Sequence, residues 1–197
     1  MRRGQPLGTY DDGEEVMWEI MNAFAKNLDK IMAPQAHMML WHSPKFAAEI
    51  REFLAKNCPD LWVQDIPLVW LKSDNKGIVA DVQRRPRNIT EFAFLISRGD
   101  RKLLKAVANG YAAPTSRVIH QSEKPIPVLK HFFQMIVDEH TRMLDPTSGS
   151  GNALVAADEF NAGRMLGIEL SPEYYERSVQ AWKKYKTLKE ASESLNG

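Results

Sequence analysis

Two short segments in the carboxyl-terminal third of the chain combine glycines, hydroxyl groups and acids at a spacing that suits nucleotide binding. They are Asp145-Pro-Thr-Ser-Gly-Ser-Gly151 and Gly163-Arg-Met-Leu-Gly-Ile-Glu169. Gly149 and Gly151 lack a Cβ, so the backbone there can turn sharply and approach a ligand closely. A helix that begins near Asn152 would offer unpaired N–H groups and a partial positive charge. Glu169 falls at the end of the following strand, where a carboxylate can accept hydrogen bonds from a ribose.

Hydrophobic periodicity predicts the elements that would position these residues. We expect strands over residues 36–42, 66–71, 91–97, 142–144 and 164–170, and helices over 13–31, 46–56, 101–108 and 127–139. A long last helix is expected after Ser171, a good N-cap, with Pro172 at its first position. Residues 73–90 are polar and basic, and they are predicted to form a loop. Strands that alternate with helices indicate an α/β fold with a mostly parallel, doubly wound sheet.

Length and composition set broad limits on the protein class. A chain of 197 residues is long enough for one domain with a full core. We expect an irregular lead-in over 1–12, the domain over 13–190 and a polar, flexible tail over 191–197. The net charge of +1 gives no overall attraction to nucleic acid or membrane. Cys58 is the only cysteine and no apolar run approaches the roughly 20 residues of a membrane span, so a cytoplasmic location without membrane attachment is expected.

Three segments together resemble the DNA amino-methyltransferases, which modify the exocyclic amine of adenine or cytosine. Asp145–Gly151 resembles their cofactor motif, His120-Gln-Ser-Glu-Lys-Pro125 the motif that lines the methionine end of the cofactor, and Gly167–Tyr175 the segment whose acid holds the ribose. The order matches the circularly permuted group, in which the catalytic half precedes the cofactor half. The resemblance covers residues 13–188 and implies a Rossmann-like methyltransferase fold, with a remnant of the catalytic half over 13–118 and the cofactor half over 119–190.

The resemblance also implies a cofactor, S-adenosylmethionine, and the residues that would hold it. These are Lys124, Pro125, Asp145, Pro146, Thr147, Gly149, Ser150, Gly151 and Glu169. By this resemblance Asp145 orients the methionine amine, Glu169 binds the ribose hydroxyls, and Lys124 with Pro125 shapes the methionine side. The chain departs from the family at Thr147, where phenylalanine is usual.

The family's catalytic motif, Asp/Asn/Ser-Pro-Pro-Tyr/Phe/Trp, does not occur in the sequence. Its expected place is before the first helix, close to residue 1. Ser43-Pro-Lys-Phe46 lies one strand too late, and Lys45 replaces the second proline. We therefore assign no catalytic residue, and we expect a sheet that lacks one central strand between residues 38–42 and 143–145. Such a chain would be truncated, inactive alone, or half of a split enzyme completed by a partner chain.

A basic stretch supplies the candidate surface for DNA. Nine basic and four acidic residues lie between Lys72 and Lys105, a local net charge of +5. Lys72, Arg84, Arg85 and Arg87 are the candidate DNA-binding residues, and phosphate contacts from them would depend on salt. DNA is the expected partner, with adenine N6 ahead of cytosine N4 as the target amine, and a homodimer remains open.

Two other functions compete with this interpretation. A non-catalytic DNA-binding or regulatory module could keep the methyltransferase fold. A nicotinamide-dependent oxidoreductase fits less well, because a third glycine is lacking at the Gly-x-Gly-x-x-Gly spacing after Gly151. The five histidines show no metal-ligand spacing with Cys58, so no metal site is expected.

Overall fold

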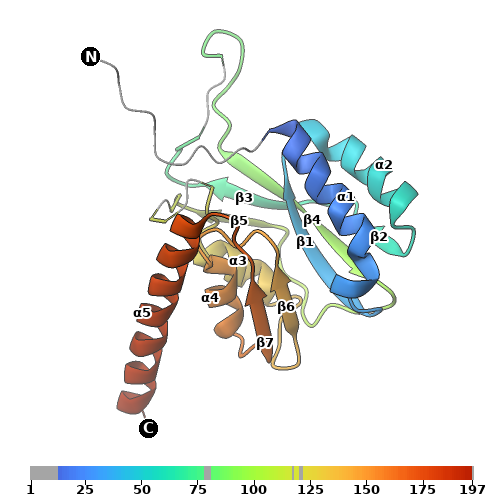
Figure 1. The fold of residues 1–197 in the computed structure, drawn as a ribbon. Coiled ribbons are helices and arrows are strands. Elements are labelled where there is room, and N and C mark those ends of the chain that lie inside the picture. Colours follow the sequence, from blue (N-terminus) through green and yellow to red (C-terminus); the bar gives the residue numbers. More distant parts are fainter. Residues whose placement is uncertain (1–12, 78–80, 117, 120–121, 197) are drawn as a thin grey trace.

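The computed structural model describes residues 13–77, 81–116, 118–119 and 122–196 (Figure 1). The first part of the chain forms α1 (Glu14–Ile31), β1 (Ala36–His42), a short 3-10 turn (Pro44–Phe46), α2 (Ala47–Asn57), β2 (Leu61–Val63), β3 (Leu68–Lys72), β4 (Thr90–Arg98) and β5 (Gly110–Ala113). The second part forms α3 (Ile126–Phe133), β6 (Arg142–Asp145), α4 (Asn152–Asp158), β7 (Arg164–Gly167) and α5 (Pro172–Asn196). No described helix is long and apolar enough to cross a bilayer.

The described strands form two separate sheets. In the larger sheet the order is β1-β4-β3-β5, and β2 also pairs with β4. Strand β4 runs antiparallel to β1, β2 and β3, whereas β3 and β5 are parallel. In the smaller sheet β6 and β7 are parallel. Strand β4 is thus the reversed strand of an otherwise parallel arrangement in the larger sheet.

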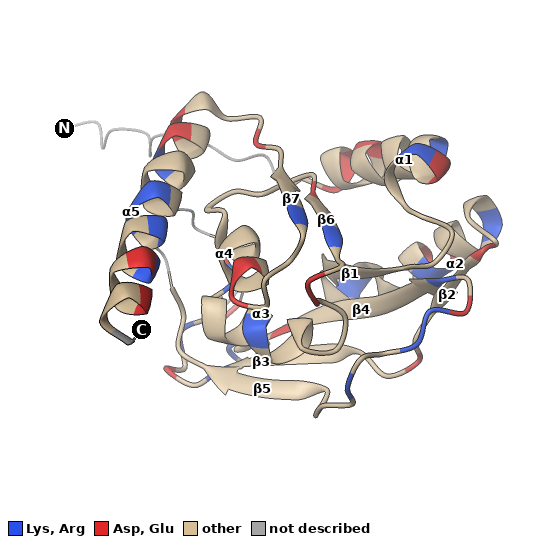
Figure 2. Ribbon diagram, turned by 90° about the horizontal axis from the view of Figure 1, so that it is seen from below, with Lys and Arg blue, Asp and Glu red and all other residues tan. Residues whose placement is uncertain are grey.

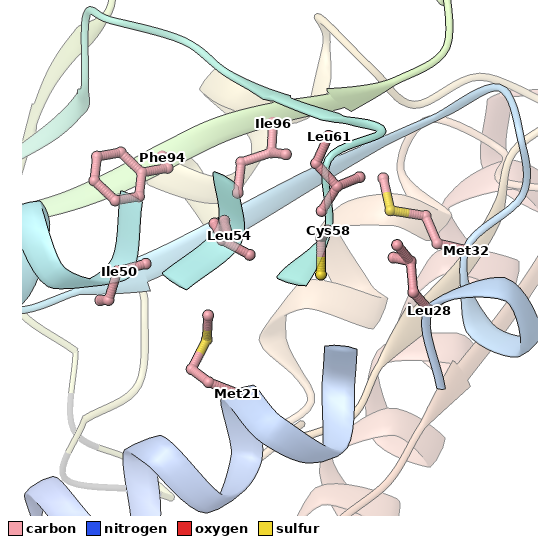
Figure 3. Packing of buried hydrophobic residues seen from close by; sticks show 9 residues of the cluster. All are labelled: Met21, Leu28, Met32, Ile50, Leu54, Cys58, Leu61, Phe94 and Ile96. Carbon is pink, nitrogen blue, oxygen red and sulfur yellow. The ribbon is translucent and has the colours of Figure 1, made fainter. Parts of the chain in front are cut away.

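One face of the larger sheet is covered by α1 and α2. Met21 of α1, Leu54 of α2 and Ile96 of β4 meet in a buried cluster, which also contains Cys58 (Figure 3). Acidic Glu14 and Glu15 in the first turn of α1 and Lys30 in its last turn favour the helix dipole. The apolar faces of these two helices therefore fix the position of β1 from one side.

Helix α3 covers the opposite face and joins the two sheets. Val128 and Phe132 are four residues apart on one side of the helix, and they pack in the cluster that contains Trp70 of β3. Leu129 and Phe133 are spaced in the same way and pack in a second cluster that contains Ala156 and Ala157 of α4. A helix of eight residues therefore positions the smaller sheet against the larger one.

Helix α5 is held against α4 by a polar network around Asp158. The Asp158 carboxylate accepts hydrogen bonds from the Tyr185 hydroxyl at 2.8 Å and from the Lys189 ammonium at 2.7 Å, and Lys186 lies 3.2 Å away. Both signs of charge are interleaved along the rest of α5 (Figure 2). The helix continues to Asn196, so the expected flexible tail is helical up to this residue.

The region between β4 and α3 differs most from the sequence-based prediction. The helix expected over 101–108 is absent, and this stretch is irregular. A backbone N–H of this stretch forms a long-range hydrogen bond instead of a helical one, since the Leu104 N–H donates to the Met135 carbonyl at 2.8 Å. Helix α3 ends at Phe133 rather than near residue 139, since tight turns follow it. Strands β2 and β5 were not predicted, and both are short.

The strand that was expected to be lacking would lie between β1 and β6. No described strand lies between β1 and β6, which belong to different sheets. Met39 and Trp41 of β1 nevertheless pack against the same cluster as Met143 of β6. The two sheets thus share a core while their neighbouring strands stay unpaired with each other.

Candidate functional site

The glycine-rich turn between β6 and α4 is built around two left-handed residues. Gly149 has φ +50° and Gly151 has φ +76°, a region that side-chain-bearing residues rarely adopt. The Gly151 N–H donates to the Ser148 carbonyl at 2.7 Å, which closes the turn. Ser150 is buried inside it. The two glycines predicted to shape this turn therefore do so through their backbone conformation.

The residue that follows strand β7 is hydrogen-bonded to both ends of the turn. The Ile168 N–H donates to the Asp145 carbonyl and the Ser148 N–H donates to the Ile168 carbonyl, each at 2.9 Å. Gly167 of β7 packs closely against α4, because a Cβ at this position would lie 2.8 Å from Leu154 Cδ1. The turn and the end of β7 thus form one rigid unit.

Glu169 directs its carboxylate back into the turn. Its Oε2 accepts a hydrogen bond from the Gly149 N–H and its Oε1 accepts one from the Ser171 N–H, both at 2.8 Å. A carboxylate oxygen has two lone pairs, so each oxygen can accept a further donor. The backbone therefore orients Glu169 without exhausting its capacity to bind hydroxyl groups.

Asp145 is the second acid of the site. Burial raises the pKa of its carboxyl group above the ordinary value, the Thr147 N–H that donates to it at 3.1 Å opposes this rise, and the charge of Glu169 adds to it. A cationic group bound beside Asp145 would relieve this unfavourable environment. The site is thus suited to a ligand with a positively charged end.

Lys124 enters the site from the start of α3. Its carbonyl accepts a hydrogen bond from Asn152 Nδ2 at 2.9 Å, and Pro125 is the N-cap residue of α3. Its ammonium lies 3.0 Å from Glu91 Oε2 and 5.3 Å from the centre of the Trp41 ring. The predicted pair Lys124-Pro125 is therefore joined to the glycine-rich turn through Asn152.

Glu91 bridges the half-buried Lys124 to a second lysine, which is buried. The ammonium of Lys72 lies 2.8 Å from Glu91 Oε1, and only a small part of Lys72 is exposed. Burial alone would raise the pKa of Glu91, but the charges of Lys124 and Lys72 hold it below its ordinary value. This Lys72–Glu91–Lys124 cluster was not assigned from the sequence, although Glu91 lies in a strand that was predicted.

The position of Lys72 corrects the prediction that this residue contacts DNA. It was expected to contact phosphates, but 8% of its surface is exposed and its ammonium is committed to Glu91. Arg84, Arg85 and Arg87 are exposed, as a DNA contact requires. Arg84 lies 3.7 Å from Asp81, and Arg87 donates to the Gly77 carbonyl at 3.3 Å.

The remaining predicted residues lie at the margin of the site or outside it. Pro146 and Thr147 are exposed at the tip of the turn. His120 and Gln121, which open the segment ending in Lys124-Pro125, lie outside the described residues. Ser43–Phe46 forms the 3-10 turn before α2, and Lys45 there is exposed. No cluster of potential metal ligands is found in the described part of the chain.

A cavity of about 250 Å³ lies on the α5 side of the turn. It is lined by parts of the turn, α4, β7 and α5, including Gly151, Leu154, Met165, Tyr175 and Trp182. The Gly151 backbone is close to α5 here, because a Cβ on it would lie 3.6 Å from Ser178 Cβ. The turn therefore borders a largely apolar hollow, and neither Asp145 nor Glu169 lines it.

DNA methyltransferases are among the solved structures with a similar fold. M1.HpyAVI, solved in complex with SAM, has a TM-score of 0.70 and 20% identity, over 85% of this chain and 84% of that chain. A candidate DNA modification methylase of Thermus thermophilus, complexed with S-adenosyl-L-methionine, has a TM-score of 0.63 and 16% identity, over 93% and 83%. The cytosine-N4-specific PvuII DNA methyltransferase has a TM-score of 0.67 and 14% identity, over 90% and 74%.

These likenesses confirm the expected Rossmann-like methyltransferase fold. At identities of 14–20% they concern the fold alone. No protein-family profile matches the chain, and no curated protein matches its sequence.

Proposed function

We propose that this chain, which shares its fold with solved DNA methyltransferases, binds S-adenosylmethionine and serves methyl transfer to an exocyclic amine of DNA. The proposal rests on two acids, Asp145 and Glu169, which both lie beside the turn at Gly149. Two acids at the ends of adjacent parallel strands suit a ligand that has a cationic end and a pair of hydroxyl groups. Neighbours with this fold, M1.HpyAVI among them, were solved with that cofactor.

Two polar groups of the cofactor, its ribose and its methionine amine, would each have a matching acid at the turn. Glu169 would accept hydrogen bonds from the ribose hydroxyls, in addition to its two backbone donors. Asp145 would accept one from the methionine amine, directly or through water. Lys124 and Pro125 would shape the methionine side, while Gly149 and Gly151 would let the backbone pass close to the cofactor. When bound, S-adenosylmethionine supplies an electrophilic methyl group on a sulfonium.

DNA is the proposed substrate because the exposed arginines of the 81–88 segment offer contacts for phosphates. A base inside a duplex cannot reach a site at a strand end, so it would have to be flipped out. We propose adenine N6 ahead of cytosine N4 as the acceptor. Nucleoside analysis of DNA after incubation would distinguish the two methylated products.

A second candidate function is a non-catalytic DNA-binding or regulatory module. One observation favours it, namely that the described residues provide no strand between β1 and β6 and the sequence holds no catalytic tetrapeptide. This candidate predicts salt-sensitive DNA binding without methyl transfer. Incorporation of labelled methyl groups into DNA by the isolated chain would exclude it.

Calorimetry with S-adenosylmethionine tests the site directly. Asp145→Ala and Glu169→Ala should each weaken binding at least about tenfold, which corresponds to roughly 1.4 kcal/mol of binding free energy. Asp100→Ala is the matched control, because Asp100 is an exposed acid paired with Lys102 far along the chain from the turn. If both site variants bound the cofactor like the parent chain, the assignment would be wrong.

A further inference from the structure

The starts of helices α3 and α4 are joined by a hydrogen bond. The Lys124 carbonyl, just before the first turn of α3, accepts this bond from Asn152 Nδ2 at 2.9 Å. Asn152 is the first residue of α4, and the N-cap residue before it is Gly151. A glycine has no side chain that could cap a helix, so the start of α4 is tied to α3 instead.

Apolar packing alone would leave these two helices free to shift along each other. Leu129 of α3 packs in the same cluster as Ala156 and Ala157 of α4. Hydrophobic contacts are non-directional, whereas a hydrogen bond has a preferred distance and angle. The bond between Lys124 and Asn152 therefore fixes the position of α4, and with it the glycine-rich turn that leads into this helix.

The Lys124 side chain is itself held by three groups around its ammonium. Glu91 Oε2 lies 3.0 Å away, and the Ser122 carbonyl accepts a hydrogen bond at 2.9 Å. The ring centre of Trp41 lies at 5.3 Å. An ammonium has three N–H donors, so two of them are taken up within the chain. Since 18% of the side chain is exposed, Lys124 serves to anchor the start of α3.

Glu91 connects this anchor to the larger sheet. It lies in β4, directly opposite Trp70 of the antiparallel strand β3. The ammonium of Lys72, the last residue of β3, lies 2.8 Å from Glu91 Oε1, while that of Lys124 approaches Oε2. Two cations on different oxygens leave the carboxylate little freedom to rotate. The larger sheet therefore holds Lys124 in a defined place.

We propose that Glu91 is a positioning residue for the glycine-rich turn. Glu91 holds the ammonium of Lys124, and the backbone of Lys124 holds Asn152. Asn152 in turn holds the start of α4 beside Gly151. The inference rests on the proposed function, because its main consequence is expected in the affinity for S-adenosylmethionine.

The same path joins the proposed DNA contact to the cofactor turn. Lys72 and Glu91 lie at the two ends of the connection between β3 and β4, and this connection contains the exposed arginines of the 81–88 segment. Methyl transfer needs the acceptor amine in line with the methyl group, so a small error in relative position is costly. An ion pair at the base of the connection and a directional bond at the turn would keep the two regions aligned.

A double-mutant cycle tests the path. Glu91→Gln keeps the shape of the side chain but weakens its hold on the ammonium. Asn152→Ala removes the hydrogen-bond donor, while alanine still favours a helix. Each change should weaken S-adenosylmethionine binding in calorimetry about fivefold, a typical coupling between sites. Because both changes break one path, the double variant should bind at most about twofold more weakly than either single variant.

Asp29→Asn is the matched control for the loss of an ion pair. Asp29 pairs with Arg98, another largely buried cation of the larger sheet, but it lies on α1. This variant should leave the cofactor affinity unchanged. Nuclear magnetic resonance of the ligand-free chain adds a readout that general destabilisation does not move. The amide signals of Gly149 and Gly151 should shift in the same direction in Glu91→Gln and Asn152→Ala, and stay in place in Asp29→Asn.

Several outcomes would overturn the proposal. Parent-like affinity or parent-like glycine signals in a folded Glu91→Gln would do so, and so would full additivity of the two changes. If Glu91→Gln does not fold, Asn152→Ala decides alone, because it removes no charge, and parent-like behaviour of this variant would be equally decisive. Failure of the parent chain to bind S-adenosylmethionine would instead contradict the proposed function. The glycine signals would then still decide whether Glu91 positions the turn.

Discussion

The carboxylate of Glu169 accepts a hydrogen bond at 2.8 Å from the backbone N–H of Gly149, twenty positions earlier in the chain. The bond ties the end of β7 to the turn that follows β6. The Ser171 N–H binds the other oxygen of the same carboxylate at 2.8 Å. Glu169 therefore organises the backbone of the site and is also its candidate ligand for hydroxyl groups.

Glu169→Gln should separate these two roles. An amide has one oxygen, so one of the two backbone N–H groups loses its acceptor, and the free energy of unfolding should fall by about 1 kcal/mol. The affinity for S-adenosylmethionine should fall about tenfold as well, since a neutral amide accepts hydrogen bonds less strongly. Denaturant unfolding and calorimetry measure the two effects. Glu173→Gln on the exposed first turn of α5 should change neither.

Asp145→Asn should stabilise the free chain at neutral pH. Burial, together with the charge of Glu169, raises the pKa of Asp145 in the folded state. Its contribution to stability is therefore fully present below the unfolded pKa, about 3.9, and is lost as the pH rises through the raised folded value. The gain in Tm of Asp145→Asn over the parent should be largest near pH 7 and vanish toward pH 3. A constant gain at all pH values would contradict this account.

Gly151→Ala should be more harmful than the same change in a regular strand. At φ +76° a Cβ introduces strain of roughly 1–2 kcal/mol, and that is the expected loss in the free energy of unfolding. Gly110→Ala in β5 is the control, because its nearest neighbour would be the Val69 carbonyl at 3.9 Å and its φ is not positive. Equal losses in urea unfolding would show that the turn carries no backbone strain.

Glu91→Gln should leave two largely buried lysines without their shared counter-charge. Because Glu91 is partly exposed, the expected loss is about 1–3 kcal/mol, less than for a fully buried pair. The pKa of Glu91 is lowered in the folded chain, so this stability is present above the unfolded pKa and lost as the pH falls through the folded value. The difference in Tm between parent and variant should therefore shrink in acid. Asp100→Asn, at the exposed pair with Lys102, should show no such loss.

Arg84→Ala/Arg85→Ala should weaken DNA binding mainly by removing phosphate contacts. The slope of log K against log salt concentration should become shallower by about 0.9 per lost contact. Lys183→Ala/Lys184→Ala removes the same charge from the exposed surface of α5 and should leave the slope unchanged. Fluorescence anisotropy at several salt concentrations gives both slopes. Equal effects of the two double variants would mean that charge alone, and not the 81–88 segment, governs binding.

The glycine-rich turn could be predicted because its determinants are local. Gly149, Gly151 and the acid at the end of the next strand lie within a continuous stretch, and the structure brings them together. The break between β1 and β6 was predicted as well, from a motif that the sequence lacks.

Features that depend on distant partners were missed or misplaced. Residues 101–108 have a helical pattern, but the carbonyl of Met135 takes up the N–H of Leu104. Strand β5 is defined only by its pairing with β3. Lys72 looked like a surface charge, and only the fold reveals that Glu91 holds it inside. In each case a tertiary contact overrides the local pattern.

The edges of β1 and β6 that lack a second partner strand among the described residues also affect how the purified chain should behave. Unpaired N–H and C=O groups at a strand edge can pair with the same groups of another molecule. Self-association should therefore increase with protein concentration and set the upper concentration for solution experiments.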